Sequence, residues 1–171
     1  GRLRLFKAVV QPTLLYGSVS WTMTRAREKM IRTTQRKMLR RIVGTPRVAA
    51  GNEIESWVAW VSRSTRMAEA EMIKNKVVDW VEEIHRRKFR WAVRTVRQED
   101  GRWTREVLTW SVGGTRLRKR PLKRWTDSLQ QFVKHFYGSD AAKENAWMEA
   151  AMDQNTWSSL ETAYVDFALQ R

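Results

Sequence analysis

Two stretches of the sequence bring several cations next to a tryptophan. The first consists of Arg86, Arg87, Lys88 and Arg90 and is followed by Trp91. The second consists of Arg116, Arg118, Lys119, Arg120, Lys123 and Arg124 and is followed by Trp125. Guanidinium and ammonium groups bind phosphates, and an indole ring beside them can stack on an unpaired base. We therefore predict a nucleic-acid-binding site at these ten cations. Trp91 and Trp125 are candidates for base stacking, although their helical spacing favours the core.

The charge of the chain is concentrated in two parts. Its 171 residues include 33 Lys+Arg and 18 Asp+Glu, which gives a net charge of +15. Residues 1–50 and 86–126 are each net +11, whereas residues 51–85 and 127–171 are net −3 and −4. Such concentration is typical of a protein that binds a polyanion. The alternatives are a basic surface without a specific partner and a basic helix that lies on a membrane surface.

The sequence offers little for catalysis or metal binding. It contains no cysteine, which excludes disulfides, thiol catalysis and cysteine-ligated zinc. His85 and His135 are the two histidines, and we expect each at the surface or in a helix cap. Adjacent acids such as Glu82 and Glu83 point in different directions on a helix, so a solvated face explains them better than a metal site. We predict no catalytic residue, no metal site and no cofactor in this chain.

Helical periodicity dominates the sequence, because apolar residues recur at steps of three and four. The expected helices cover residues 3–15, 27–43, 53–74, 77–96, 103–110, 121–137 and 140–152, and a last helix is capped by Asn155 or Thr156. This pattern predicts an all-α fold, an irregular bundle of six to eight helices with a tryptophan-rich core and basic loops. No apolar run approaches the ~20 residues that span a bilayer.

A few residues mark the ends and the buried faces of these helices. We expect Pro12 to interrupt the first helix and Gly44 to terminate the second. Met30, Trp57 and Phe136 fall in the apolar stripes and are expected in the core.

Pro121 follows the second basic stretch and suits the first turn of a helix. A helix that begins there would offer free N–H groups to a phosphate, with Lys123 and Arg124 in its first turn. Gly113 and Gly114 would let the preceding backbone approach the phosphate closely.

Five segments, read in order, resemble one family. They are LFKAVVQPTLLYGSVSWTMT (5–24), REKMIRTTQRKMLRRIVGT (27–45), RRKFRWAVRTVRQEDGRWTREVLTW (86–110), RKRPLKRWTDSL (118–129) and WSSLETAYVDF (157–167). Together they resemble the region after the polymerase core of the reverse transcriptases of non-LTR, LINE-like retrotransposons. The fourth segment resembles that family's G-R-P-x-x-R-W-x-D-D-L box, with Lys119 in place of its glycine.

The resemblance implies a function for the whole chain. It implies a non-catalytic part of the enzyme, with a basic thumb-like helical segment at 1–50 and a C-terminal helical extension at 51–171, or one continuous domain. This part would grip the RNA template and the primer duplex with low sequence specificity, beside the polymerase domain of the same polypeptide. Mg²⁺ is expected only in that polymerase core, which lies upstream of the present chain.

Further expectations concern the parent polypeptide and the place of the protein in the cell. The parent would be an RNA-directed DNA polymerase of a transposable element. Because the chain does not begin with Met, we expect a fragment of a longer polypeptide. We expect a nuclear or cytoplasmic ribonucleoprotein, neither secreted nor membrane-bound. The alternative function is a helical protein-interaction module whose basic surface meets an acidic partner.

Overall fold

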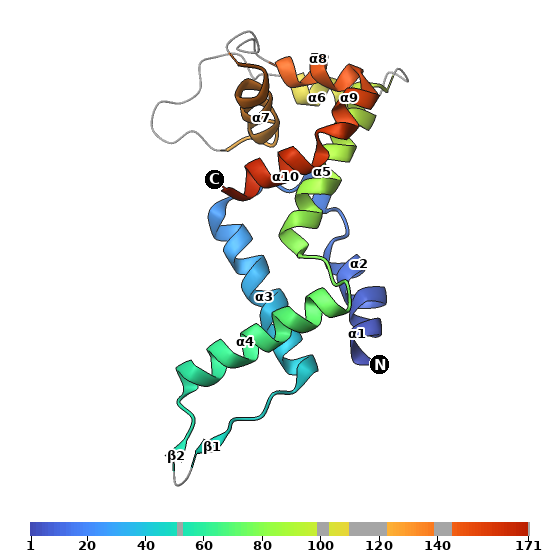
Figure 1. Ribbon diagram of the computed structural model, residues 1–171. Coiled ribbons are helices and arrows are strands. Elements are labelled where there is room, and N and C mark those ends of the chain that lie inside the picture. The colour runs from blue at the N-terminus through green and yellow to red at the C-terminus, as the bar shows by residue number, and fades with distance from the viewer. Residues whose placement is uncertain (51–52, 99–102, 110–122, 139–144, 171) are drawn as a thin grey trace. The chain divides into compact units, whose positions relative to one another are not determined.

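The computed structural model describes residues 1–50, 53–98, 103–109, 123–138 and 145–170 (Figure 1). The chain forms two compact units, which are treated separately below. Unit 1 consists of Gly1–Tyr16 and Arg25–Glu83, and unit 2 of Gly17–Thr24 and Ile84–Arg171. The expected division into a thumb-like segment at 1–50 and a C-terminal extension at 51–171 stays a prediction.

The all-α prediction is confirmed. The α-helices of the described residues are α1 (Arg2–Leu5), α2 (Gln11–Leu14), α3 (Arg25–Val43), α4 (Trp57–Lys74), α5 (Trp80–Val96), α6 (Trp103–Thr109), α7 (Asp127–Tyr137), α8 (Ala146–Met152), α9 (Gln154–Ser159) and α10 (Glu161–Gln170). A π-helical turn at Phe6–Val10 joins α1 to α2, and a 3₁₀ turn lies at Ser18–Ser20. Two antiparallel strands of two residues each, β1 (Ala49–Ala50) and β2 (Glu53–Ile54), form a small hairpin.

The first helical stretch continues through Pro12, so the expected interruption there is wrong. Proline lacks the N–H that an α-helix needs in its interior. The wider π-helical turn precedes it, and Pro12 then occupies the first turn of α2, where no such N–H is required.

Helix α3 ends where the sequence predicts, but it buries a different face. Gly44 follows its last residue with a φ of 68°, a left-handed conformation that favours glycine. Met30 is exposed, so its predicted place in the core is wrong. The buried side chains of α3 are instead Glu28, Gln35 and Leu39. Polar residues therefore contribute to the buried face, which a search for apolar periodicity does not detect.

Gln35 joins α3 to the start of α5 inside unit 1. Its side chain is 1% exposed, and its Nε2 donates a hydrogen bond to the Val78 carbonyl at 2.8 Å. Its Oε1 accepts a hydrogen bond from the Trp80 N–H at 3.1 Å. The amide thus satisfies two backbone groups that α5 leaves open at its N-terminus.

We expect Gln35→Leu to lower the free energy of unfolding by about 1–3 kcal/mol. Leucine has a similar size but leaves both backbone groups without their side-chain partner. Urea denaturation would measure the loss, with Thr33→Leu on the exposed side of α3 as the control. Equal stability of the two variants would contradict a structural role for the amide.

Helix α4 begins at Trp57 and not at Glu53, because the preceding residues form the hairpin. The Ser56 hydroxyl accepts a hydrogen bond from the Ala59 N–H and caps the helix. The Glu55 carboxylate forms an ion pair with Arg63 at 2.8 Å, and this guanidinium lowers the pKa of Glu55. Trp57 lies at the helix start with 63% exposure, so its predicted burial is wrong.

Helix α5 begins at Trp80, three residues later than expected. Lys76 adopts a positive φ of 50°, a left-handed conformation in which an α-helix cannot continue, so the chain changes direction after α4. The Asp79 carboxylate then accepts hydrogen bonds from the N–H groups of Val81 and Glu82 at 2.9 and 3.3 Å. This acidic cap fixes the start of the helix that carries the first basic stretch.

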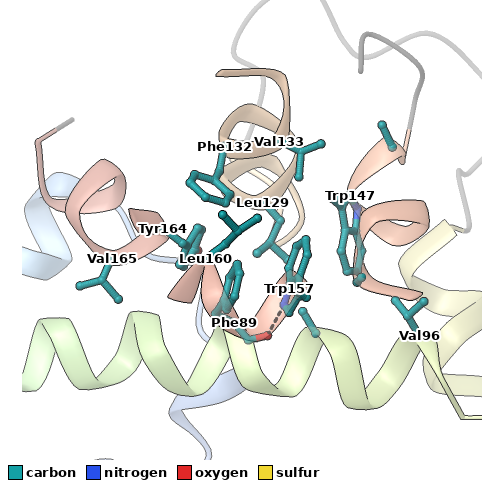
Figure 2. Close-up of a cluster of buried hydrophobic side chains, with 13 residues drawn as sticks. Phe89, Val96, Leu129, Phe132, Val133, Trp147, Trp157, Leu160, Tyr164 and Val165 are labelled. Carbon is teal, nitrogen blue, oxygen red and sulfur yellow. Dashed lines mark hydrogen bonds between the residues drawn. The ribbon is translucent and has the colours of Figure 1, made fainter. Parts of the chain in front are cut away.

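The core of unit 2 is rich in aromatic rings, as predicted, and α5 and α7–α10 contribute to it (Figure 2). Phe89 lies between Trp157 and Tyr164, with ring centroids at 4.3 and 4.8 Å. The Trp157 Nε1–H donates a hydrogen bond to the Phe89 carbonyl at 3.2 Å. Phe136 lies at the half-exposed edge of this cluster, so its predicted place in the core is wrong.

The last helix expected from the sequence is divided into α9 and α10. Asp153, and not Asn155 or Thr156, caps α9 by accepting hydrogen bonds from both of their N–H groups. A hydrogen bond from the Thr156 hydroxyl, together with these backbone hydrogen bonds, holds the pKa of Asp153 below its usual value. The expected cap at Asp140 lies outside the described residues.

Candidate nucleic-acid interface

Three cations of the first basic stretch lie three and four positions apart on α5, so they share one side of the helix. Arg86 and Arg87 are half-buried. The Arg90 side chain is 63% exposed and forms two hydrogen bonds with the Glu161 carboxylate, at 2.6 and 2.7 Å. These three arginines therefore keep at least partial exposure on α5, and their role in binding stays a prediction.

Lys88 is buried, which removes it from the predicted contact surface. The residue is only 2% exposed. Its Nζ donates hydrogen bonds to the Trp125 carbonyl and to the Ser128 hydroxyl, the latter at 2.8 Å. The same Nζ lies 4.7 Å from the centroid of the Trp125 ring. Lys88 thus joins α5 to the start of α7.

The environment of Lys88 disfavours its charge. Burial lowers the pKa of this amine to about 7, and the nearby positive charge of Lys123 lowers it further, whereas Asp127 opposes the change. A lysine in this state is suited to hold neighbouring elements together, and it is poorly placed to meet a phosphate at the surface.

Trp91 and Trp125 pack against each other. Their ring centroids are 5.1 Å apart in an edge-to-face arrangement, and Trp125 meets buried Trp147 in the same way at 6.2 Å. The Trp125 Nε1–H also donates a hydrogen bond to the Val19 carbonyl at 2.6 Å. Both rings are half-buried, which agrees with the preference of their spacing for the core.

The second basic stretch lies only partly within the described residues. Lys123 and Arg124 are exposed, whereas Arg116, Arg118, Lys119 and Arg120 lie outside the described residues. Lys123 and Arg124 precede α7 and are not in its first turn, so the expected helix start at Pro121 is wrong. The Asp127 carboxylate accepts a hydrogen bond from the Arg124 N–H at 2.8 Å, and the helix begins with that aspartate.

A groove in unit 2 brings together cations that the predicted site omits. Arg90 and Arg94 of α5 line one side of it together with Arg97, which directly follows the last residue of the helix. Gln154, Ser158 and Glu161 line the other side, and the groove has a volume of about 600 Å³. The helical spacing of these arginines in the sequence could have indicated that Arg94 and Arg97 share a face with Arg90.

In unit 1, six cations of α3 fall into two sets. Arg32, Arg36 and Arg40 contact Asp79, Glu69 and the Thr65 hydroxyl, respectively, at 3.6, 2.6 and 2.9 Å. Lys29, Lys37 and Arg41 are exposed. We call these three residues the exposed α3 cations. The first cationic block of the sequence thus supplies both structural and exposed charges.

The two histidines differ in their surroundings. His85 is buried, with its ring 6.1 Å from that of Tyr164, so its expected place at the surface or in a cap is wrong. His135 is exposed and stacks on Phe167 with ring centroids 5.1 Å apart.

Within the described parts of the chain, no three His, Asp or Glu side chains are grouped as metal ligands would be. None of the described helices combines the length and the apolar character needed to cross a membrane.

Comparisons with known proteins give one point of similarity. No protein-family model and no solved structure matches the chain. The chain is 31% identical over 159 residues to a curated protein of Caenorhabditis elegans whose name describes it as transposon-derived. The match covers 91% of this chain and 52% of the relative, so the chain spans about half the length of the protein it resembles.

Proposed function

We propose that this chain is the non-catalytic, nucleic-acid-binding C-terminal part of a non-LTR retrotransposon reverse transcriptase. In this proposal it grips the RNA template and the primer duplex, while an upstream polymerase domain performs the chemistry with Mg²⁺. The five ordered segments that resemble this enzyme family support the proposal. Similarity to a transposon-derived protein agrees with an origin in a transposable element.

The observation that carries the proposal is the sorting of charge on α3. The arginines that face neighbouring elements have acidic or hydroxyl partners, whereas the exposed α3 cations face solvent. Exposed cations on one helix repel one another, and a bound polyanion relieves this repulsion while its own counterions are released. Arg94, Lys123 and Arg124 supply exposed charge in unit 2.

We expect the purified chain to bind RNA and duplex DNA with affinities that fall steeply as salt rises. On duplex DNA the slope of log K against log salt should be about −0.9 for each phosphate contact. Fluorescence anisotropy with labelled duplexes of unrelated sequence would measure it. A flat response, or binding to polyglutamate but to no nucleic acid, would contradict the proposal and favour the protein-interaction alternative.

A charge-reversal pair tests the predicted site in the second basic stretch. We expect the change of Arg118, Lys119 and Arg120 to Glu to weaken nucleic-acid binding far more than three reversals elsewhere. Each lost phosphate contact removes one released counterion, so the salt slope should also become smaller. Anisotropy titrations at two salt concentrations would measure both effects.

The matched control uses Arg2, Arg66 and Lys76, which are exposed cations of unit 1. Arg63 is unsuitable because it forms an ion pair with Glu55 and donates a hydrogen bond to the Pro46 carbonyl at 2.7 Å. Both triple variants change the net charge by the same amount. Equal losses of affinity would show that net charge alone governs binding and that no defined site exists.

A further inference from the structure

We propose that the groove lined by Arg90, Arg94 and Arg97 binds the sugar-phosphate backbone of a single nucleic-acid strand, and that Glu161 occupies part of this site until the strand displaces it. This inference rests on the proposed function and assigns it a location and a type of strand. It concerns residues of unit 2 alone.

The three guanidiniums are spaced along one side of α5 and of the turn that continues it, where the Arg97 N–H donates a hydrogen bond to the Val93 carbonyl at 3.2 Å. An α-helix rises about 1.5 Å per residue, so Arg94 lies about 6 Å along the axis from Arg90 and about 4.5 Å from Arg97. A backbone that runs beside α5 would meet these groups one after another. Guanidinium groups bind phosphates through paired hydrogen bonds, which makes arginine better suited to this task than lysine.

The floor of the groove is closed to bases. Phe89 and Trp157 line it, but their rings stack on each other at 6° between ring planes, and each residue is only 1% exposed. Tyr164 covers the other face of Phe89. A nucleobase therefore cannot insert between these rings, and the polar rim must recognise the backbone. This arrangement predicts binding without preference for base identity.

The shape of the groove favours one strand over a duplex. Its volume of about 600 Å³ is within the range of sites that enclose small ligands. A single strand is narrow enough to lie between α5 and the helices α9 and α10. A duplex presents a broad convex surface, so it would contact only the rim of the groove. Proteins that bind single strands commonly use such cationic grooves that follow the backbone.

The Glu161 carboxylate would compete with a phosphate for Arg90. Its carboxylate forms two hydrogen bonds with Arg90, a geometry that a phosphate can also adopt. The Arg90 side chain is largely exposed, so solvent weakens the pair. Arg97 similarly donates a hydrogen bond to the Gln154 side chain across the groove. Entry of a strand would replace these internal partners with phosphates.

The decisive experiment compares Glu161→Gln with Glu149→Gln, which removes the same charge from an exposed site on α8. We expect Glu161→Gln to bind a labelled 12-nucleotide single strand about two- to fivefold more tightly than Glu149→Gln, the effect of releasing one exposed ion pair. Equal affinities, or weaker binding by Glu161→Gln, would overturn the role of Glu161.

A second pair tests the cations themselves. We expect replacement of Arg94 and Arg97 by Gln to weaken single-strand binding about tenfold at low salt, because two phosphate contacts are lost. The control replaces exposed Arg105 and Lys134 by Gln and should retain most of the affinity. Near-UV circular dichroism would verify folding of both variants. Equal affinity of the two double variants would overturn the assignment of the groove.

An abasic strand of the same length tests the closed floor. We expect it to bind within about twofold of the normal strand, because binding through the backbone has no need of bases. A loss of tenfold or more would show that bases stack, which contradicts the inference. If the unaltered chain binds no nucleic acid, the proposed function fails. If it binds but the groove variants match their controls, the groove inference alone fails.

Discussion

Phe89→Ala should lower the free energy of unfolding of unit 2 by about 3–5 kcal/mol. The ring stacks between Trp157 and Tyr164 and meets the Phe132 ring edge-to-face at 6.1 Å. Its removal would leave a cavity that neighbouring aromatic side chains cannot fill without breaking their own contacts. Urea denaturation followed by near-UV circular dichroism would measure the loss.

Phe136→Ala is the matched control, because it removes the same ring from α7 at a half-exposed position. We expect this change to cost about 1 kcal/mol or less, since solvent already reaches the ring. Similar losses for the two variants would mean that the stack around Phe89 is not the centre of the core.

Lys88 should make the stability of the protein rise with pH above neutrality. The amine has a pKa of about 7 in the folded chain and 10.5 in the unfolded chain. Between these values the unfolded chain binds more protons, so a higher pH favours the folded state. Below pH 7 the full cost of burying the charge applies. We expect a gain of about 2 kcal/mol from pH 7 to pH 9.

Urea midpoints at pH 7, 8 and 9 would measure this gain for the unaltered chain and for Lys88→Met. Methionine keeps most of the apolar stem but has no proton to lose, so the dependence on pH should largely disappear. Lys123→Met is the control, because it should keep the dependence while raising the pKa of Lys88. A Lys88→Met variant with an unchanged pH profile would contradict this explanation.

The ends of several helices could be predicted because local chemistry determines them. Gly44 adopts the left-handed conformation that terminates α3, and the break at Lys76 falls where the sequence suggests it. The start of α7 could not be predicted from Pro121, because it depends on the bond between Asp127 and the Arg124 N–H. A favourable residue for a helix start does not exclude a stronger start a few positions later.

The candidate site was only partly predictable, for a related reason. Lys88 stands among exposed or half-buried arginines, and nothing in its sequence neighbourhood distinguishes it from them. Its burial depends on Trp125 and Ser128, which lie 37 and 40 positions away. The groove likewise depends on α9 and α10, which place Gln154 and Glu161 opposite α5. Helical spacing reveals which residues share a face, but it does not reveal what covers that face.

The contacts of Lys88 extend to a third group, since the Ser128 hydroxyl lies 3.1 Å from the Tyr164 hydroxyl. A charged ammonium group can only donate, so Ser128 then accepts from Lys88, which leaves its own proton available for Tyr164. A neutral amine has a lone pair, which allows Ser128 to donate to Lys88 and to accept from Tyr164. Loss of one proton from buried Lys88 would therefore allow the polarity of this hydrogen-bond chain, which ends at fully buried Tyr164, to reverse.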